Sequence, residues 1–197
     1  MKNNLVEEFY DNGQLKSRTL IHNRIRNGLR EEYFENGQIK MKGNYFEDKE
    51  HGEFHIFYSN GQLKAKLNYI NGKIEGLLEQ YYENGKLDSK IPYKDNIIEG
   101  EFSDFYDNGK LKSQGKYNNG LLNGRLTTFH PNGELFSATD YLSGVRYGSH
   151  ISYWENGKLF ENCFFDNGLL NGPFECYNED GILIKECIYR NGIEMDE

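Results

Sequence analysis

The sequence predicts an all-β protein, an elongated single-layer antiparallel β-meander made of eight hairpin repeats of 24 residues. Three observations support this fold. A glycine recurs every 24 residues, it follows Asn in seven of eight repeats, and aromatic residues, 15% of the chain, recur in register with it. A fixed period of this length is typical of a repeat protein in which one supersecondary unit is copied. We call these residues the turn glycines: Gly13, Gly37, Gly61, Gly85, Gly109, Gly133, Gly157 and Gly181.

The spacing also predicts that residues 1–197 form a single repeat array. All 22 glycines fall at four positions of the repeat, and no insertion or deletion interrupts residues 13–181. The chain therefore shows no linker and no domain boundary.

Two turns are expected in each repeat. Asn-Gly at the turn glycine indicates a two-residue type I′ turn, because both central residues of that turn need positive φ. A second turn is indicated at Asn71-Gly72 and its equivalents. Arg24 and Asp48 replace that second glycine in the first two repeats, so looser connections are expected there.

Alternation along the strands assigns the two faces of the sheet. We number each repeat from its turn glycine, so that Leu15 is at +2 and Tyr10 at −3. A two-residue turn at Asn156-Gly157 would place Trp154 opposite Leu159 and Tyr153 opposite Phe160. Face one then carries the apolar positions +2, +8, −3 and −7 and is predicted to be the core. The glycines at −9, such as Gly100, lie on the same face and are expected to leave room for aromatic rings.

Face two carries one aromatic position, −4, which in the first five repeats mostly lies beside a Lys at +3. In the last three repeats the +3 residue is apolar, and the +7 residue of two repeats is apolar as well. Exposed apolar patches of this size usually mark an interface. The predicted protein-binding residues are Phe129, Phe136, Tyr153, Phe160, Phe164, Tyr177, Ile184 and Ile188.

The charge is uneven along the chain. The net charge is −8, and residues 138–197 hold 4 Lys+Arg against 11 Asp+Glu. This balance argues against nucleic acid or an anionic membrane surface as the main partner. An apolar centre with an acidic surround favours a basic protein partner. The alternative is that the last repeats cap the array and the sheet curls to bury these rings.

The residues with catalytic or metal-binding chemistry form no recognisable site. On a strand, His51 and His55 would lie about 13 Å apart, too far to share an ion. Cys163 and Cys187 would lie about 10 Å apart, beyond disulfide reach. We therefore expect no enzyme activity, no cofactor and no metal. The odd number of Cys residues, three, and the lack of an apolar leader segment favour a cytoplasmic location.

The segment Tyr81-Tyr82-Glu83-Asn84-Gly85-Lys86-Leu87, with Glu99-Gly100 after it, resembles the bacterial variant of the MORN repeat. The resemblance covers about Glu8 to Gly192 in eight copies. Chains of this kind are often labelled YwqK-type antitoxins. The resemblance implies an antiparallel β-meander without catalytic residues that binds and neutralises a cognate toxin, often a secreted nuclease or deaminase. Asn178 departs from the pattern, because it replaces an aromatic residue.

Three classes of function remain open. The first is an immunity or antitoxin protein that binds a basic toxin domain through the C-terminal repeats. The second is a structural scaffold or homodimer joined through the apolar patch or an open edge strand. The third is a membrane or envelope adaptor, a role suggested for other MORN proteins, against which the net charge counts.

Overall fold

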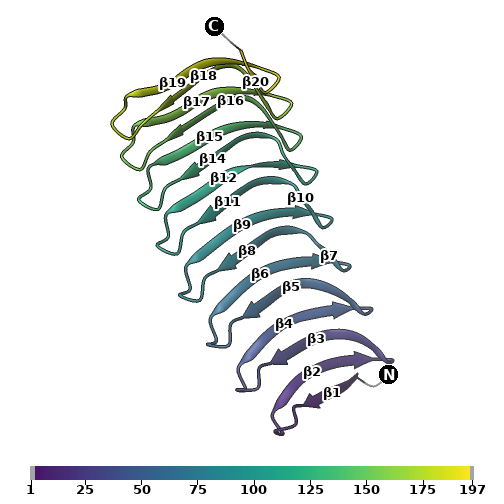
Figure 1. The fold of residues 1–197 in the computed structure, drawn as a ribbon. Coiled ribbons are helices and arrows are strands. Elements are labelled where there is room, and N and C mark those ends of the chain that lie inside the picture. The colour runs from purple at the N-terminus through teal and green to yellow at the C-terminus, as the bar shows by residue number, and fades with distance from the viewer. Residues whose placement is uncertain (1–2, 196–197) are drawn as a thin grey trace. The chain divides into compact units, whose positions relative to one another are not determined.

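A computed structural model describes residues 3–195, and its chain divides into two compact units, residues 1–97 and 98–197. In each unit, strands lie side by side in chain order, and each pairs antiparallel with the next (Figure 1). The described residues contain no helix. The predicted all-β antiparallel meander is therefore confirmed. The prediction of a single array over residues 1–197 stays a prediction, because each unit is described by itself.

The strands follow the repeat closely. Some repeats have a short extra strand, because the chain leaves the ladder for one residue before the −9 glycine, as at Glu75 before Gly76. In unit 1 the strands are β1 (Asn3–Phe9), β2 (Leu15–His22), β3 (Ile25–Tyr33), β4 (Ile39–Phe46), β5 (Lys49–Phe57), β6 (Leu63–Ile70), β7 (Lys73–Ile74), β8 (Gly76–Tyr81) and β9 (Leu87–Lys94). The short strand β10 (Ile97–Ile98) lies at the boundary between the units. In unit 2 they are β11 (Gly100–Phe105), β12 (Leu111–Asn118), β13 (Leu121–Leu122), β14 (Gly124–Phe129), β15 (Leu135–Leu142), β16 (Val145–Tyr153), β17 (Leu159–Asp166), β18 (Leu169–Tyr177), β19 (Leu183–Arg190) and β20 (Ile193–Glu194).

The first turn of each repeat is not the type I′ turn that Asn-Gly predicts. In the first repeat, Gly13 N–H donates to Tyr10 C=O, and Tyr10 N–H donates to Gln14 C=O. Gly13 has φ +82°, whereas Asn12 is not among the residues with positive φ. This is the pattern of a type I turn followed by a glycine bulge, the usual longer alternative to a two-residue hairpin.

The Asn before the turn glycine has a different role from the predicted one. Its Oδ1 accepts a hydrogen bond from the backbone two residues on, as Asn108 does from Lys110 N–H at 2.8 Å. Its Nδ2 donates to the next repeat, as Asn108 does to Pro131 C=O at 2.9 Å. The same pair of bonds recurs at Asn132 and Asn156. Asn thus closes its own turn and joins neighbouring hairpins.

The second turn is the type I′ turn, since Asn71 and Gly72 both have positive φ. Arg24 and Asp48 adopt the same conformation, with φ of 71° and 64°. The looser connections expected at these two residues are therefore wrong. At Asp48 the side chain compensates for the missing glycine, because its Oδ1 accepts a hydrogen bond of 2.8 Å from Arg26 N–H of the preceding repeat.

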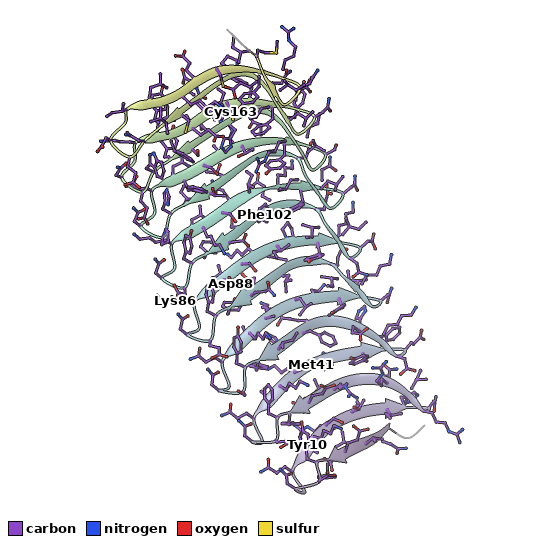
Figure 2. All side chains as sticks on the ribbon, viewed as in Figure 1. Tyr10, Met41, Lys86, Asp88, Phe102 and Cys163 are labelled. Carbon is purple, nitrogen blue, oxygen red and sulfur yellow. The ribbon has the colours of Figure 1, made fainter. Side chains whose placement is uncertain are left out.

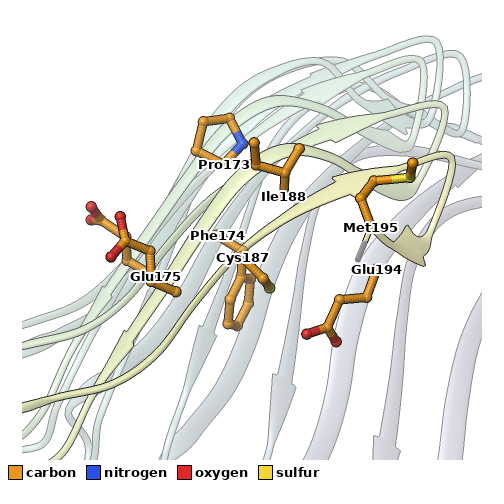
Figure 3. A pocket seen from close by; sticks show the side chains of 8 residues that line it. Pro173, Phe174, Glu175, Cys187, Ile188, Glu194 and Met195 are labelled. Carbon is orange, nitrogen blue, oxygen red and sulfur yellow. The ribbon is translucent and has the colours of Figure 1, made fainter. Parts of the chain in front are cut away.

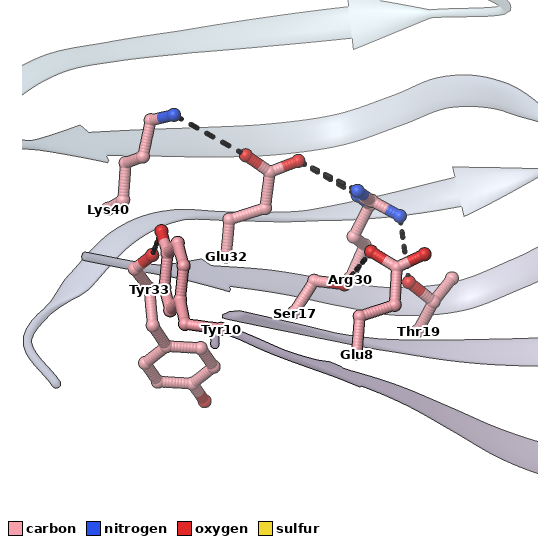
Figure 4. Close-up of polar contacts among 8 residues, drawn as sticks. All are labelled: Glu8, Tyr10, Ser17, Thr19, Arg30, Glu32, Tyr33 and Lys40. Carbon is pink, nitrogen blue, oxygen red and sulfur yellow. Dashed lines mark hydrogen bonds and ion pairs between the residues drawn. The ribbon is translucent and has the colours of Figure 1, made fainter. Parts of the chain in front are cut away.

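The longer first turn shifts the strand register. Tyr153 pairs with Leu159 and Ser152 with Glu161, so the predicted pairs Trp154–Leu159 and Tyr153–Phe160 are wrong. Phe160 is left over as a bulge residue. The bulge moves the +3 side chain from face two to face one, where Lys40 lies 4.0 Å from Glu32 (Figure 4). In the same way, Lys112 lies over the ring of Tyr106.

The core lies on face one at +8 and −7, as the alternation predicts, but the predicted place of +2 in it is wrong, because Leu159 pairs with Tyr153 of the face-two position −4. In unit 1, Tyr45, Phe54 and Leu67 form a buried cluster. In unit 2, Phe102 and Cys163 are buried on strands β11 and β17 (Figure 2). The strands of each unit are arched (Figure 1), so neighbouring side chains on one face can shield one another without a second layer.

Two glycines, but not the predicted ones, make room for rings. A Cβ atom on Gly43 would lie 2.4 Å from the ring of Phe54, and one on Gly115 would lie 3.0 Å from the ring of Phe102. At Gly52, one of the −9 glycines, a Cβ atom would meet nothing within 4 Å, but φ is +82°. The −9 position therefore needs glycine for its backbone conformation. The expectation of room for a ring is therefore wrong at Gly52, whereas Gly100 shares the positive φ, at +114°.

Candidate protein-binding surface

The eight residues predicted to bind a partner lie in unit 2 but not on one face. Phe136 and Phe160 are +3 residues and contact face-one rings: Phe136 lies 4.9 Å from His130, and Phe160 lies 4.4 Å from Trp154, between ring centroids. Ile184 occupies the same +3 position. The remaining five, at −4 and +7, keep the face-two alternation: Phe129, Tyr153, Phe164, Tyr177 and Ile188. The prediction of one continuous patch is therefore wrong, and the bulge is the reason.

The exposure of these residues also divides them. Ile184, Ile188, Phe136 and Phe164 are 61%, 59%, 44% and 44% exposed. The other four, Phe129, Tyr153, Phe160 and Tyr177, are half-buried. Whether any of the eight binds a partner stays a prediction.

Phe136 and Phe160 border a groove on face one of unit 2 with a volume of about 670 Å³. Rings of Phe102 and Tyr117 and a row of hydroxyl groups line it. The hydroxyls are largely paired across strands, as Ser113 Oγ is with Asp104 at 2.6 Å. The groove is thus an aromatic surface whose polar groups mostly bond to one another.

At the end of this groove, Ser152, His150, Glu161 and Cys163 come together. His150 Nε2 lies 3.7 Å from Glu161 Oε1, and Cys163 Sγ donates to the same oxygen at 3.3 Å. Burial raises the pKa of the Cys163 thiol to about 12, and burial lowers the pKa of His150. A thiol with this pKa is protonated at neutral pH, so Cys163 is not an activated thiolate.

A row of charged residues crosses face two in unit 1, at positions −6 and +5. The acids and bases alternate: Glu7 pairs with Arg18, Arg18 with Glu31 and Glu31 with Lys42. The alternation is interrupted at His55, which pairs with Lys42 and with Lys66. Lys66 in turn pairs with Glu79 and forms a salt bridge of 3.0 Å with Glu53. The Arg18 guanidinium, by a direct hydrogen bond, lowers the pKa of Glu31. Each carboxylate of the row thus has a basic residue opposite it.

The same row in unit 2 ends differently. Its residues are uncharged from Ser103 to Asn162, and then Glu175 pairs directly with Glu186 across strands β18 and β19. Glu175 accepts a hydrogen bond of 3.2 Å from Asn162 Nδ2, on its inner side. Like charges directly opposite one another destabilise a strand pair.

The charge imbalance lies entirely in unit 2. Residues 1–97 hold 15 Lys+Arg and 15 Asp+Glu, whereas residues 98–197 hold 8 and 16, a net charge of −8. Unit 2 therefore carries a negative electrostatic potential, which is strongest at low salt.

The Glu175–Glu186 pair lies beside an open cavity of about 980 Å³ at strand β19 (Figure 3). Its walls include Phe174, Cys187 and Ile188, together with the acids of the pair and Glu194. Glu194 is already bonded, because Lys185 Nζ donates to it at 2.7 Å and so lowers its pKa. Both apolar and acidic side chains thus line the cavity.

The structure shows no group of three or more His, Cys, Asp or Glu residues that could hold a metal ion within residues 3–195. His51 is exposed beside Phe46, whereas His55 bonds to Glu53 at 3.0 Å. In the same part of the chain, no helix is long and apolar enough to cross a membrane.

The fold and this surface define a class, a non-helical repeat protein whose hairpins stack into a sheet. The family model described as MORN repeat variant matches residues 2–23, 26–47, 50–71, 74–95, 98–119, 146–167 and 170–191. The chain therefore belongs to the MORN repeat variant family. Successive matches begin 24 residues apart, except for a gap of one repeat between residues 119 and 146, so seven of the eight expected copies match and the resemblance is confirmed at the level of the repeat. No curated protein matches the chain.

Sequence reasoning missed the Glu175–Glu186 pair. The overall acidity of residues 138–197 was visible, but a count of charges does not show which carboxylates face each other. The signal was present at −6 and +5, where an acid and a base stand in three of the first four repeats, His55 and Lys66 stand in the third, and two acids stand in the last. Comparing the charges at these two positions repeat by repeat could have found it.

Proposed function

We propose that the chain is a non-catalytic protein-binding repeat protein that acts as an immunity or antitoxin protein and neutralises a basic toxin domain. The acid excess of unit 2, 16 Asp+Glu against 8 Lys+Arg, is the observation that carries the proposal. Exposed apolar side chains on the same unit, such as Phe164 and Ile188, supply contact area for a partner. The antitoxin role itself rests on the resemblance to YwqK-type chains.

The binding mode follows from the physical properties of unit 2. Acidic groups steer a basic partner to the surface and set its orientation, whereas desolvated apolar side chains supply most of the affinity. A partner held in this way should dissociate as salt is added, because screening weakens the charge contribution.

The test is affinity capture of the full chain from the lysate of its source cell, at low and at high salt, with identification by mass spectrometry. A single basic protein that elutes with salt is the expected result. Expressed alone, that protein should arrest growth, and coexpression with the chain should restore growth. A captured protein that is not toxic would contradict the antitoxin role.

A scaffold that joins copies of itself is the second candidate. It is favoured by the exposed apolar side chains on the edge strand β1, where Leu5 and Phe9 project into solvent. In that case, capture would recover only the chain itself, in a form that resists salt. Sedimentation of the purified chain would show a stable oligomer.

A further inference from the structure

We infer that the Glu161 side chain is a two-position switch on face one of unit 2, which bonds to Ser152 while the His150 imidazole is neutral and pairs with His150 when that imidazole is protonated. This inference goes beyond the proposed function, because the switch needs no partner protein. It makes the charge and the side-chain arrangement at one end of the aromatic groove depend on pH.

Ser152 carries a buried hydroxyl that lacks a hydrogen bond. The residue is 4% exposed, and within the described residues its Oγ has no partner. It lies at −5, directly opposite Glu161 at +4 across strands β16 and β17. A buried hydroxyl without a partner costs free energy, so a bond from Ser152 to the neighbouring carboxylate is favourable.

The same two positions are bonded in other repeats. Ser17 Oγ donates to Glu8 at 2.9 Å across strands β1 and β2 (Figure 4). Further pairs at these positions are bonded as well: Ser89 with Gln80, Ser113 with Asp104 and Thr128 with Ser137. Ser152 and Glu161 have the residue types of the first pair, with the two strands exchanged. The strand geometry therefore allows the Glu161 carboxylate to reach Ser152 Oγ.

In the structure, Glu161 occupies the other position. Its Oε1 accepts a hydrogen bond of 3.3 Å from Cys163 Sγ and lies 3.7 Å from His150 Nε2. A thiol is a weak donor, and 3.7 Å is too long for a hydrogen bond to a neutral imidazole. While His150 is neutral, a bond from the Ser152 hydroxyl is therefore the stronger interaction for this carboxylate.

Protonation of His150 reverses the preference. Thr139 Oγ1 lies 2.7 Å from His150 Nδ1, which holds the ring with Nε2 toward Glu161. The side chains of His150 and Glu161 are 13% and 25% exposed, so solvent screens their charges only in part. A charged donor binds a carboxylate more strongly than a neutral hydroxyl does. The imidazolium therefore draws the carboxylate away from Ser152.

The groups around His150 set the pH of the change. Burial lowers the pKa of His150, Glu161 opposes this shift and Arg146 of the same strand adds to it. Tyr141 of strand β15 lines the same groove, and the Cys163 thiol of β17 stays neutral because its pKa is raised to about 12. The change should therefore occur below the ordinary pKa of His, about 6.5.

An NMR titration of the full chain tests the inference. Signals of the His150 imidazole and the Glu161 carboxyl are followed from about pH 8 to about pH 4, a range that includes the ordinary pKa values of His and Glu. The variants are Ser152→Ala, Glu161→Gln and the two changes combined. Ser113→Ala is the control, because it removes a hydroxyl of the same groove that bonds to Asp104. Circular dichroism of each variant checks that the fold is retained.

Ser152→Ala should raise the pKa of His150 by roughly half a pH unit, because the imidazolium no longer competes with the hydroxyl for the carboxylate. Glu161→Gln should lower this pKa, and adding Ser152→Ala should then have little further effect. Ser113→Ala should titrate like the native chain. In the native chain, the Glu161 signal should move at the pH at which His150 titrates.

An unchanged pKa of His150 in Ser152→Ala would overturn the inference, because the hydroxyl would then not hold the carboxylate. So would an equal shift in the Glu161→Gln background, since Ser152 would then act without Glu161. A Glu161 signal that does not follow the titration of His150 in the native chain would overturn it without any variant.

Discussion

Single residues hold each repeat in place by contacts that differ from position to position. Gly43 and Gly115 are needed because a ring lies where their Cβ atom would be, whereas Gly52 is needed because its φ is +82°. Asp48 and Asn96 adopt the positive φ of the second turn without glycine, and each accepts a hydrogen bond from the preceding repeat. The same repeat thus uses small residues for two physical reasons.

The two kinds of glycine should respond differently to substitution. Gly43→Ala should lower the free energy of unfolding by about 1–3 kcal/mol, because the Cβ atom would overpack against Phe54. Gly52→Ala should cost about 1 kcal/mol through backbone strain alone. Asn tolerates positive φ, so Gly52→Asn should restore stability and Gly43→Asn should not. Chemical denaturation measures all four variants, and unchanged stability of Gly43→Ala would contradict the packing role.

Asp140 should make stability depend on acid pH. A hydrogen bond from Arg125 lowers the pKa of the Asp140 carboxyl, with a smaller contribution from Ser149. A carboxyl whose pKa is lowered by folding stabilises the protein above its unfolded pKa and loses that effect as pH falls through the folded pKa.

Asp140→Asn should therefore lower the free energy of unfolding by up to about 1 kcal/mol at pH 7. The difference should begin to shrink below about pH 4 and vanish only below the lowered pKa of the folded state. Urea unfolding of both proteins at several pH values tests this, and a difference that does not shrink as the pH falls below about 4 would show that Asp140 acts by packing and not by charge.

At the scale of the hairpin, neighbouring repeats are joined by side chains as well as by strand pairing. The bulge frees the C=O group of the −4 residue from the ladder, and the −3 residue of the preceding repeat donates to it. Tyr10 bonds to Tyr33 C=O at 2.7 Å in this way (Figure 4), and Trp154 Nε1 bonds to Tyr177 C=O at 3.0 Å. Different donors at −3 thus make one bond, which explains why His130 can replace Tyr there.

Removing this donor should weaken the contact between two hairpins. Tyr106→Phe deletes the hydroxyl that donates to Phe129 C=O at 2.7 Å and should cost about 1 kcal/mol. Phe34 lacks a hydroxyl at the same position, so Phe34→Tyr is the matched gain and should stabilise the protein. Thermal unfolding measures both variants against the native chain. Equal shifts of the unfolding temperature in the two variants would contradict the role of the hydroxyl.

How far the sequence predicts this structure depends on whether local or longer-range contacts decide it. The period, the second turn at Asn71-Gly72 and the core position of Phe54 follow from spacing and alternation alone. The first turn does not, because Asn12-Gly13 is compatible with two hairpin types and bonds to the next repeat favour the longer one. That choice moved Phe136 and Phe160 to the other face, so the candidate surface was only partly predictable.

At the scale of the whole chain, the two units have the same repeat and different surfaces. Unit 1 combines 15 basic and 15 acidic residues, and each carboxylate of its face-two row has a basic residue opposite it. Unit 2 has a net charge of −8, and its row ends in two adjacent carboxylates, Glu175 and Glu186. Stability in repeat proteins is approximately a sum over neighbouring units, so electrostatics can act on each unit separately.

Salt should therefore shift the stability of the two units in opposite directions. Screening weakens the attraction between Arg18 and Glu31 in unit 1, and it weakens the repulsion between Glu175 and Glu186 in unit 2. The test compares amide hydrogen exchange at 0.05 M and 1 M NaCl, between which the Debye length changes roughly fourfold. With rising salt, exchange in unit 1 should become faster and exchange in unit 2 should become slower. Each change should be a few-fold, since exposed pairs contribute about 0.2–1 kcal/mol. Glu175→Gln with Glu186→Gln is the control, and it should slow exchange around β19 at low salt and remove most of the salt response there. Parallel changes in both units would mean that salt acts through general hydrophobic strengthening, and that the charge rows do not govern local stability.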